Sequence, residues 1–338
     1  MSNKLSEVQA RMNGVHGLES VVGAMRGIAA ARSREARSRL DGIRACARIV
    51  SAAIGDALLL IDDHTSHETA APDRDAKQDA AVVIVLCAEQ GFVGTFNEHV
   101  IDAALASATA HAQSSSTEYL LLGDRGIVAA TERGLNIGWS APMITHAEEV
   151  PALADRLTGV LFQRLIAGQT TRVSVIHATP NPTATVQIVE QILLPFDYGR
   201  FSVTSSVTSS VTTSATSPAT ARRNPPLINL PPQRLLSQLA EEYIFAQLCE
   251  AIMLSFAAEN EARMRAMIAA RTNVHDKLEA LTGDFRRLRQ EEITSEIVEL
   301  SAGSIAAGRP SKKSRPKPTR DCGARLHPLF LTSPNHHG

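Results

Sequence analysis

The sequence predicts an α/β protein in which a long helix at each end of the chain carries a coiled-coil stripe and a small, mostly parallel sheet lies between them. Apolar or small residues recur at alternating steps of four and three in both terminal segments, which is the pattern of a coiled-coil seam. Residues 81–87 (AVVIVLC) form a continuous β-branched run of strand length, typical of a strand buried on both faces. Two terminal helices of this kind can pair with each other.

The N-terminal stripe predicts one long helix. Its members are Leu5, Val8, Met12, Val15, Val22, Met25, Ala29, Leu40, Ala47, Ile54 and Leu58. Gly14, Gly17, Gly23 and Gly27 lie in the same segment, although glycine inside a helix costs up to about 1 kcal/mol relative to alanine. Close backbone approach to the partner helix is one physical reason to retain these glycines.

The N-terminal segment is basic. Residues 1–50 contain nine Lys or Arg against four Asp or Glu, although the net charge of the whole chain is −1. A basic helix favours an acidic or phosphate-bearing partner, while charges at these spacings also suit a solvated helix face. A non-catalytic coiled-coil protein that binds nucleic acid or an anionic membrane through this segment and the basic residues after 308 is therefore an alternative function.

The middle of the chain alternates strand-like and helix-like runs. Further strands are expected at residues 119–122, 172–178 and 185–194, with helices at 100–111, 127–133 and 150–167. This alternation predicts a mostly parallel sheet. The turn Gly91-x-x-Gly94 follows the first strand, where phosphates bind in dinucleotide-binding folds, but the three-glycine fingerprint is incomplete and no P-loop sequence exists.

No catalytic or metal-ligating motif accompanies this sheet. The chain lacks a Gly-x-Ser-x-Gly elbow and a His-Glu-x-x-His helix. His64 and His67 lie in a polar stretch without the further ligands that a zinc site needs. Cys46, Cys87, Cys249 and Cys322 are scattered, and the first three follow helix or strand patterns in which cysteine acts as a small hydrophobe. We expect no cofactor, no metal and a reducing cytoplasm.

Membrane insertion and secretion are not expected. The longest apolar run, residues 80–88, is shorter than the roughly 20 residues that a membrane-spanning helix needs. Residues 1–9 contain Glu7 and no apolar core, unlike a secretory signal. We read a mature bacterial-type N-terminus and expect membrane contact only through partners.

The C-terminal stripe predicts a second helix, separated from the sheet by a Ser/Thr/Pro-rich linker. From Cys249 the stripe contains Met253, Phe256, Asn260, Met264, Met267, Arg271, Val274, Leu278, Leu281, Phe285 and Leu288. Pro232 suits the first position of this helix. Residues 232–301 would extend about 100 Å if unbroken. The alternative is a long helix packed in a helical domain, but this length favours a shaft.

Four segments resemble the γ subunit of F-type ATP synthases. Residues 24–32 (AMRGIAAAR) resemble that family's Lys-Ala-Met-x-Met-Val-Ala-Ala-x-Lys segment, and residues 89–97 (EQGFVGTFN) resemble its Asp-Arg-Gly-Leu-Cys-Gly-Gly-x-Asn loop. Residues 258–267 (AENEARMRAM) and 289–299 (RQEEITSEIVE) are the strongest matches. Gly27 replaces the second methionine and Gly23 the usual lysine. The resemblance spans roughly residues 1–305.

The resemblance implies an antiparallel coiled coil of the terminal helices with a Rossmann-like domain at its side. The implied organisation is a coiled-coil helix (1–61), a linker (62–80), the Rossmann-like domain (81–200), a Ser/Thr/Pro-rich linker (201–231), a second coiled-coil helix (232–303) and a basic disordered tail (304–338). The implied function is that of a rotor shaft, itself non-catalytic, which couples ion translocation through the membrane ring to ATP synthesis or hydrolysis.

The resemblance also implies partners and contact residues. The partners are the α and β catalytic subunits, the ε subunit and the c-ring, on the cytoplasmic side of the bacterial inner membrane. The contact residues carried over are Met25, Arg26, Arg263, Arg289, Gln290, Thr294, Glu296 and Glu299. Residues 227–232 and 257–260 also resemble the divergent N-type ATPase branch, some members of which are proposed to move Na⁺; ion choice is set in the membrane ring.

Overall fold

A computed structural model of the chain describes residues 2–60, 80–110, 116–168, 170–181, 186–202 and 227–307. The chain divides into two units, residues 10–282 and the terminal segments 1–9 and 283–338. Residues 62–79 of the predicted linker 62–80, most of the linker 201–231 and the tail from 308 onward lie outside the described residues, as do His64, His67 and Cys322. Ala80, the last residue of the first predicted linker, begins β1.

The described elements follow the predicted order. They are α1 (Ser2–Leu59), β1 (Ala80–Leu86), α2 (Phe96–Ala110), β2 (Ser116–Leu122), α3 (Asp124–Glu132), β3 (Ile137–Ala141), η1 (Ala147–Glu149), α4 (Val150–Ile166), β4 (Arg172–Thr179), β5 (Gln187–Leu194), α5 (Gly199–Ser202) and α7 (Pro232–Ala307). The two long terminal helices are confirmed. Strand β3 (IGWSA) was not predicted, because glycine and serine interrupt its apolar pattern.

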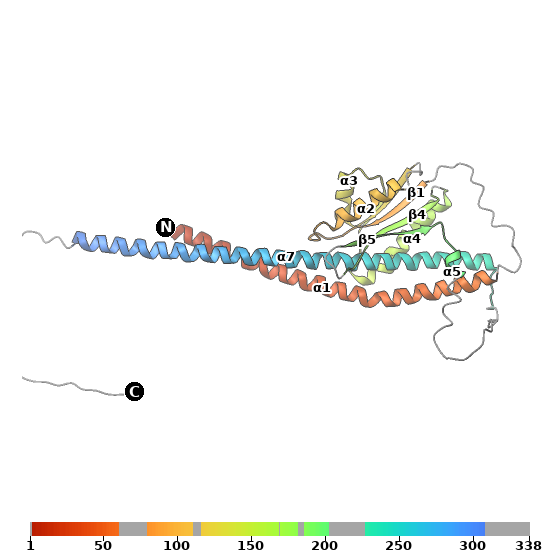
Figure 1. Ribbon diagram of the computed structural model, residues 1–338, viewed down its shortest axis with the longest axis horizontal. Coiled ribbons are helices and arrows are strands. Elements are labelled where there is room, and N and C mark those ends of the chain that lie inside the picture. The colour runs from red at the N-terminus through yellow and green to blue at the C-terminus, as the bar shows by residue number, and fades with distance from the viewer. Residues whose placement is uncertain are drawn as a thin grey trace, which may run out of the picture. The chain divides into compact units, whose positions relative to one another are not determined.

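The sheet has five strands in the order β3-β2-β1-β4-β5. Strands β1 to β4 pair in parallel, and β5 pairs antiparallel to β4, so the predicted mostly parallel sheet is confirmed. Side chains of β1 alternate between two cores, because successive residues of a strand point to opposite faces. Val82, Ile84 and Leu86 pack with α4 and α7, whereas Val83 and Val85 pack with α2. Figure 1 shows α2 and α3 on one side of the sheet and α7 on the other.

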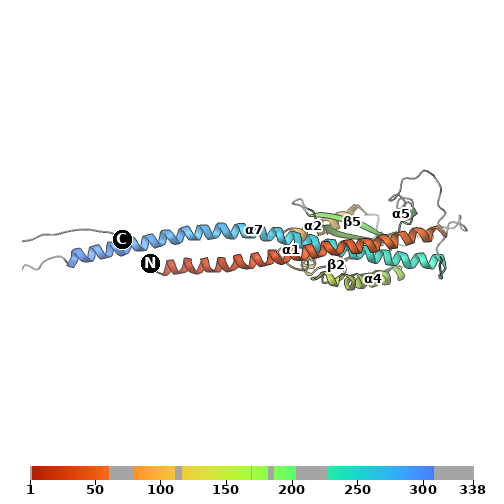
Figure 2. The same cartoon turned by 90° about the horizontal axis from the view of Figure 1, so that it is seen from below.

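Within residues 10–282, α1 and α7 lie side by side and run in opposite directions (Figures 1 and 2). The Arg44 Nε atom donates to the Glu250 carboxylate at 2.7 Å, and the Ser33 hydroxyl donates to Glu261 at 3.5 Å. Further along α1, Val50 and Ile54 pack in one cluster with Leu236 and Leu239. Residue numbers therefore rise on one helix as they fall on the other, which makes the pair antiparallel.

The predicted seam is buried over most of its length. On α1 the buried members are Val22, Ala29, Leu40, Ala47 and Ile54, and on α7 they are Met253, Phe256, Asn260, Met267, Val274, Leu278 and Leu281. Burying one large aliphatic or aromatic side chain stabilises a fold by about 1.5–3 kcal/mol. The seam therefore accounts for a substantial part of the stability of the helix pair.

The expected close approach at the glycines of α1 is wrong. A Cβ atom added at Gly14, Gly17, Gly23 or Gly27 would meet no atom within 4 Å, and all four positions are exposed. The contacts with α7 are made instead by the buried seam residues of α1. The glycines are exposed, and no contact among the described residues explains them.

Candidate functional site

Among the described residues, two of those with positive φ lie in the loop between β1 and α2, which we call the β1–α2 loop (residues 87–95). Phe92 has φ 63° and Gly94 has φ 60°. Phe92 is the only non-glycine residue with positive φ among the described residues, and its side chain is 67% exposed. A large residue in this conformation is strained and is not held there by a hydrophobic core.

Glu89 fixes one side of this loop. Its carboxylate accepts hydrogen bonds from the backbone N–H groups of Met143 at 2.7 Å and Asp124 at 3.3 Å, so it lies where β1, β2 and β3 end. In nucleotide-binding α/β folds this edge of the sheet holds the phosphates. Here a carboxylate of the chain takes two of the backbone donors. The turn Gly91-x-x-Gly94 therefore belongs to a braced loop, and its geometry does not support a phosphate site.

Arg263 of α7 fixes the other side of the loop. Its guanidinium donates to the backbone carbonyls of Gln90 at 3.0 Å and Gly91 at 3.2 Å. It also donates to Asn260 Oδ1 at 3.2 Å and to Glu259 Oε1 at 2.5 Å. These bonds use the planar fork of donors that arginine presents.

The Glu259–Arg263 pair is buried, with Glu259 3% and Arg263 5% exposed. Burial raises the pKa of Glu259, while Arg263 and the backbone amides of Gln90 and Glu89 oppose that rise. Glu259 Oε2 nevertheless makes no hydrogen bond of regular geometry among the described residues. A buried ion pair is sensitive to the loss of either partner, because the remaining charge is then unpaired.

The side chain of Arg263, a predicted contact residue, is thus buried and hydrogen-bonded within this chain. Met25 and Arg26 lie on α1 within residues 10–282; Met25 is half-buried and Arg26 is exposed. Neither contacts the β1–α2 loop in any described interaction. Arg32, further along α1, donates to the Gln90 side chain at 3.5 Å.

The remaining predicted contact residues lie on the last part of α7, in the terminal unit. Arg289, Gln290, Thr294, Glu296 and Glu299 are all exposed. The Thr294 hydroxyl donates to the Gln290 carbonyl at 2.8 Å, within the helix. Ile293, Ile297, Val298 and Leu300 are also exposed. This end of α7 therefore presents both polar and apolar side chains to its surroundings.

Several arginines of basic α1 are paired within the chain. Arg37 forms an ion pair with the buried carboxylate of Glu261, and Arg44 pairs with Glu250. Arg39 pairs with Glu35 and with Glu148 at 3.1 Å. Apart from Glu35, which lies on the same helix, these partners were missed from the sequence because each lies far along the chain on another element. They reduce the positive charge that an external phosphate could use.

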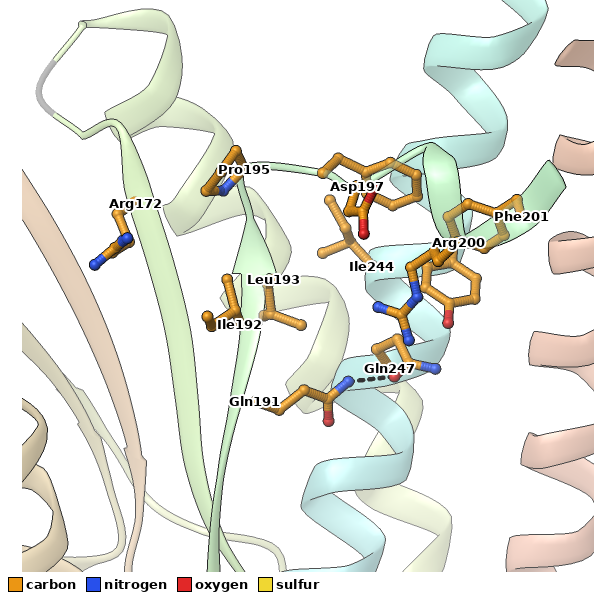
Figure 3. Close-up of a pocket in the computed structure, with 12 residues that line it drawn as sticks. Arg172, Gln191, Ile192, Leu193, Pro195, Asp197, Arg200, Phe201, Ile244 and Gln247 are labelled. Carbon is orange, nitrogen blue, oxygen red and sulfur yellow. Dashed lines mark hydrogen bonds between the residues drawn. The ribbon is translucent and has the colours of Figure 1, made fainter. Parts of the chain in front are cut away.

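Sequence reasoning also missed a cavity of about 310 Å³ between β5, α5 and α7. Figure 3 shows Gln191 of β5 hydrogen-bonded to Gln247 of α7, with Asp197 on the segment that leads to α5 and Arg200 within α5. The Phe196 and Phe201 rings stack at 5.3 Å, and Tyr243 meets both edge-on. This aromatic cluster ties the end of the sheet to α7.

Three buried titratable groups lie elsewhere in the described residues. Burial lowers the pKa of His177 to about 4 and raises the pKa values of Cys87 and Cys249 to about 12, so all three are neutral near pH 7. Cys46 is exposed, contrary to expectation. In the described parts of the chain there is no group of three or more His, Cys, Asp or Glu arranged to hold a metal, and no helix is long and apolar enough to cross a membrane.

Known proteins similar to this chain are ATP synthase subunits. The family profile described as ATP synthase matches residues 4–307. The ATP synthase gamma chain of Salinibacter ruber is 28% identical over 328 residues, covering 89% of this chain and 97% of the relative. That of Bdellovibrio bacteriovorus is 22% identical over 305 residues, covering 89% and 98%. A chain of the Euglena gracilis mitochondrial ATP synthase (OSCP/F1/c-ring, rotational state 3) has a TM-score of 0.57 at 12% identity, covering 93% of this chain and 99% of that one.

Proposed function

Because this chain belongs to the family of ATP synthase gamma chains, we propose that it couples ion flow through a membrane ring to ATP synthesis or hydrolysis in a catalytic hexamer. It is the central rotor shaft of such a complex. The observation that carries the proposal is the antiparallel pair of α1 and α7 with the sheet packed against it. A shaft needs a stiff body that resists twisting, and a buried seam braced by a sheet supplies one.

The partners follow from this role. We propose that the α and β catalytic subunits surround the exposed end of α7 and that the ε subunit and the c-ring bind at the other end of the shaft. The chain would then be a peripheral protein on the cytoplasmic side of a bacterial inner membrane, touching the membrane only through the complex. The N-type branch, with Na⁺ as the transported ion, stays a prediction.

The proposed coupling residues are those carried over from the family pattern. They are Met25, Arg26, Arg289, Gln290, Thr294, Glu296 and Glu299, with Arg263 acting through the β1–α2 loop. Exposure supports this assignment for Arg26 and for the residues of α7 from 289 onward. Their side chains are free of the seam and can contact another subunit.

Co-purification tests the proposed function. The full chain is expressed with the α and β subunits from its own operon or genome, and a tag on β is used to isolate the complex. We expect the chain to co-purify and the complex to hydrolyse ATP and pump ions. A chain that does not join the hexamer, or a hexamer whose multisite ATPase is the same without it, would overturn the proposal. Measuring pumping with H⁺ and Na⁺ in turn identifies the ion.

A further inference from the structure

The cavity between β5, α5 and α7 has the dimensions of a small-molecule site. Its volume of about 310 Å³ is at the lower end of the range of about 300–1,000 Å³ that ligand pockets occupy. Well-packed protein interiors leave few voids larger than a water molecule. A hollow of this size is therefore larger than an ordinary packing defect, and the residues that line it indicate what it can hold.

One wall of the cavity is aromatic. The ring centroids of Phe196 and Phe201 lie 5.3 Å apart in a stacked pair, and Tyr243 of α7 meets these rings edge-on at 5.7 and 5.1 Å. Phe201 is 2% exposed, whereas Phe196 and Tyr243 are half-buried. Aromatic rings pack favourably against further aromatic rings in stacked or edge-to-face geometry. The wall therefore favours a ligand with a planar, apolar body.

The surroundings of the cavity change from apolar to polar. Leu193 and Ile244 line both the cavity and a small apolar space that is bounded by residues of α4. Tyr243 and Gln247, in contrast, are shared with a polar groove that is lined by arginines and acidic residues of α1 and α7. Such a gradient suits an amphipathic ligand, whose apolar body and polar group need different surroundings.

Three polar side chains converge on the cavity. The amides of Gln191 and Gln247 are hydrogen-bonded to each other, and the Arg200 side chain points toward Gln247 (Figure 3). The Arg200 guanidinium also lies 5.7 Å from the centroid of the Phe201 ring. A guanidinium has five N–H donors, and its planar fork matches a carboxylate, so it can bind a ligand beside its other partners. Arg200 is thus placed to hold an anionic group next to the aromatic wall.

The charge of the lining favours an anion over a cation. Arg172 and Arg200 outnumber Asp197 among the charged residues that line the cavity. Asp197 also has a structural role, because its Oδ1 accepts from Gly199 N–H at 3.0 Å in the manner of an Asx turn. A cleft whose lining carries a net positive charge attracts anions.

We propose that this cavity binds a small aromatic carboxylate, with the ring of the ligand against Phe196 and Tyr243 and its carboxylate on Arg200. The aromatic wall packs in one cluster with Val50 and Ile54 of α1, so the ligand binds where the sheet meets both long helices. Its occupancy stabilises this junction, since a ligand that binds only the folded state shifts the equilibrium toward that state. The inference goes beyond the proposed function and does not depend on it.

Three probes with the same aromatic body test the ligand class on the full chain: 1-naphthoate is an anion, 1-naphthamide is neutral and 1-naphthylmethylammonium is a cation. By calorimetric titration we expect saturable binding of 1-naphthoate, about tenfold tighter than that of 1-naphthamide, because a hydrogen bond to a charged group is stronger than one to a neutral group. The cation should bind most weakly, and 1-naphthoate should raise the melting temperature. No saturable binding of 1-naphthoate, or equal affinities for the three probes, would overturn the proposal.

Two substitutions at exposed positions should move the affinity for 1-naphthoate in opposite directions. Arg200→Gln should lower it about tenfold and leave the affinity for 1-naphthamide unchanged. Asp197→Asn should raise it, because the asparagine oxygen can still accept from Gly199 N–H while the repelling charge is gone. Arg125→Gln on α3 is the matched control, since Arg125 is also exposed and α3 lies on the other side of the sheet (Figure 1). An affinity that Arg200→Gln lowers no more than Arg125→Gln does would refute the site.

Tyr243→Leu tests the aromatic wall. It removes one ring but keeps an apolar side chain, so all three probes should bind more weakly while the preference for the anion stays; unchanged affinities would refute the wall. If Tyr243→Leu does not fold, Arg200→Gln still decides the site. A chain that binds 1-naphthoate but fails to join the hexamer would overturn only the proposed function, and a chain that assembles and pumps but binds none of the probes would overturn only this site.

Discussion

The ion pair between β2 and α4 provides a sharp test of how the sheet is held. Arg164 donates to Glu118 through two parallel hydrogen bonds, Nε to Oε2 at 2.9 Å and Nη2 to Oε1 at 2.7 Å. The side chains are 16% and 31% exposed. Buried hydrogen bonds to charged groups contribute about 1.5–3 kcal/mol to the free energy of unfolding, whereas surface ion pairs contribute about 0–1 kcal/mol. Because this pair is partly exposed, we expect Glu118→Gln to lower the free energy of unfolding by about 1–2 kcal/mol.

Gly138 of β3 gives the same site a second, independent perturbation. A Cβ atom there would lie 1.6 Å from Glu118 Oε1 and 2.4 Å from its Cγ. Gly138→Ala must therefore displace the Glu118 side chain and lose both hydrogen bonds. We expect a loss of about 1–2 kcal/mol, although alanine otherwise suits a strand better than glycine. Gly159→Ala on α4 is the control, because a Cβ there meets nothing within 4 Å.

The stability that the Glu118–Arg164 pair contributes should depend on pH, and the direction follows from the pKa of Glu118. The hydrogen bonds from Arg164 lower the pKa of Glu118. A carboxyl with a lowered pKa in the folded state adds stability above its unfolded pKa of about 4.3, and this stability is lost as the pH falls through the folded value. Guanidinium unfolding of the full chain at pH 7 and at pH 3 measures the difference. A Glu118→Gln deficit that is as large at pH 3 as at pH 7 would refute the reasoning.

Further predictions concern the coupling surface and the segments predicted to be linkers. Met25→Lys should lower ions pumped per ATP more than it lowers thermal stability, because a half-buried charge on α1 can pair with the hexamer; unchanged pumping would count against Met25. Replacing Arg289 and Gln290 with Ala should slow multisite ATP turnover without loss of helicity measured by circular dichroism, because both side chains are exposed; normal turnover would remove them from the coupling set. Deleting residues 203–220 should leave assembly intact, because a Ser/Thr-rich composition cannot build a core; gel filtration with α and β checks this, and a chain that stays outside the complex would indicate a docking role.

The sequence was sufficient for the terminal helices, since a stripe repeated over many turns leaves few alternatives. The sequence was not sufficient to predict the burial of Arg263, because the family pattern groups this residue with the contact residues. Burial of a charged side chain depends on which distant backbone groups meet it, here the carbonyls of Gln90 and Gly91. The same holds for Arg37 and Glu261, whose pairing depends on the antiparallel register of two helices. Periodicity predicts the element, but long-range polar partners require the fold.

The β1–α2 loop explains why a sheet of nucleotide-binding type can serve a shaft. Its glycine turn occupies the place where phosphates bind in related folds, and fold alone does not decide the use of that place. Glu89 brings a negative charge to the strand ends and takes two of the backbone donors there. Arg263 of α7 donates hydrogen bonds to the carbonyls of the next two residues, Gln90 and Gly91. The residues that would have held a ligand instead join the sheet to the shaft, so that the two turn as one body.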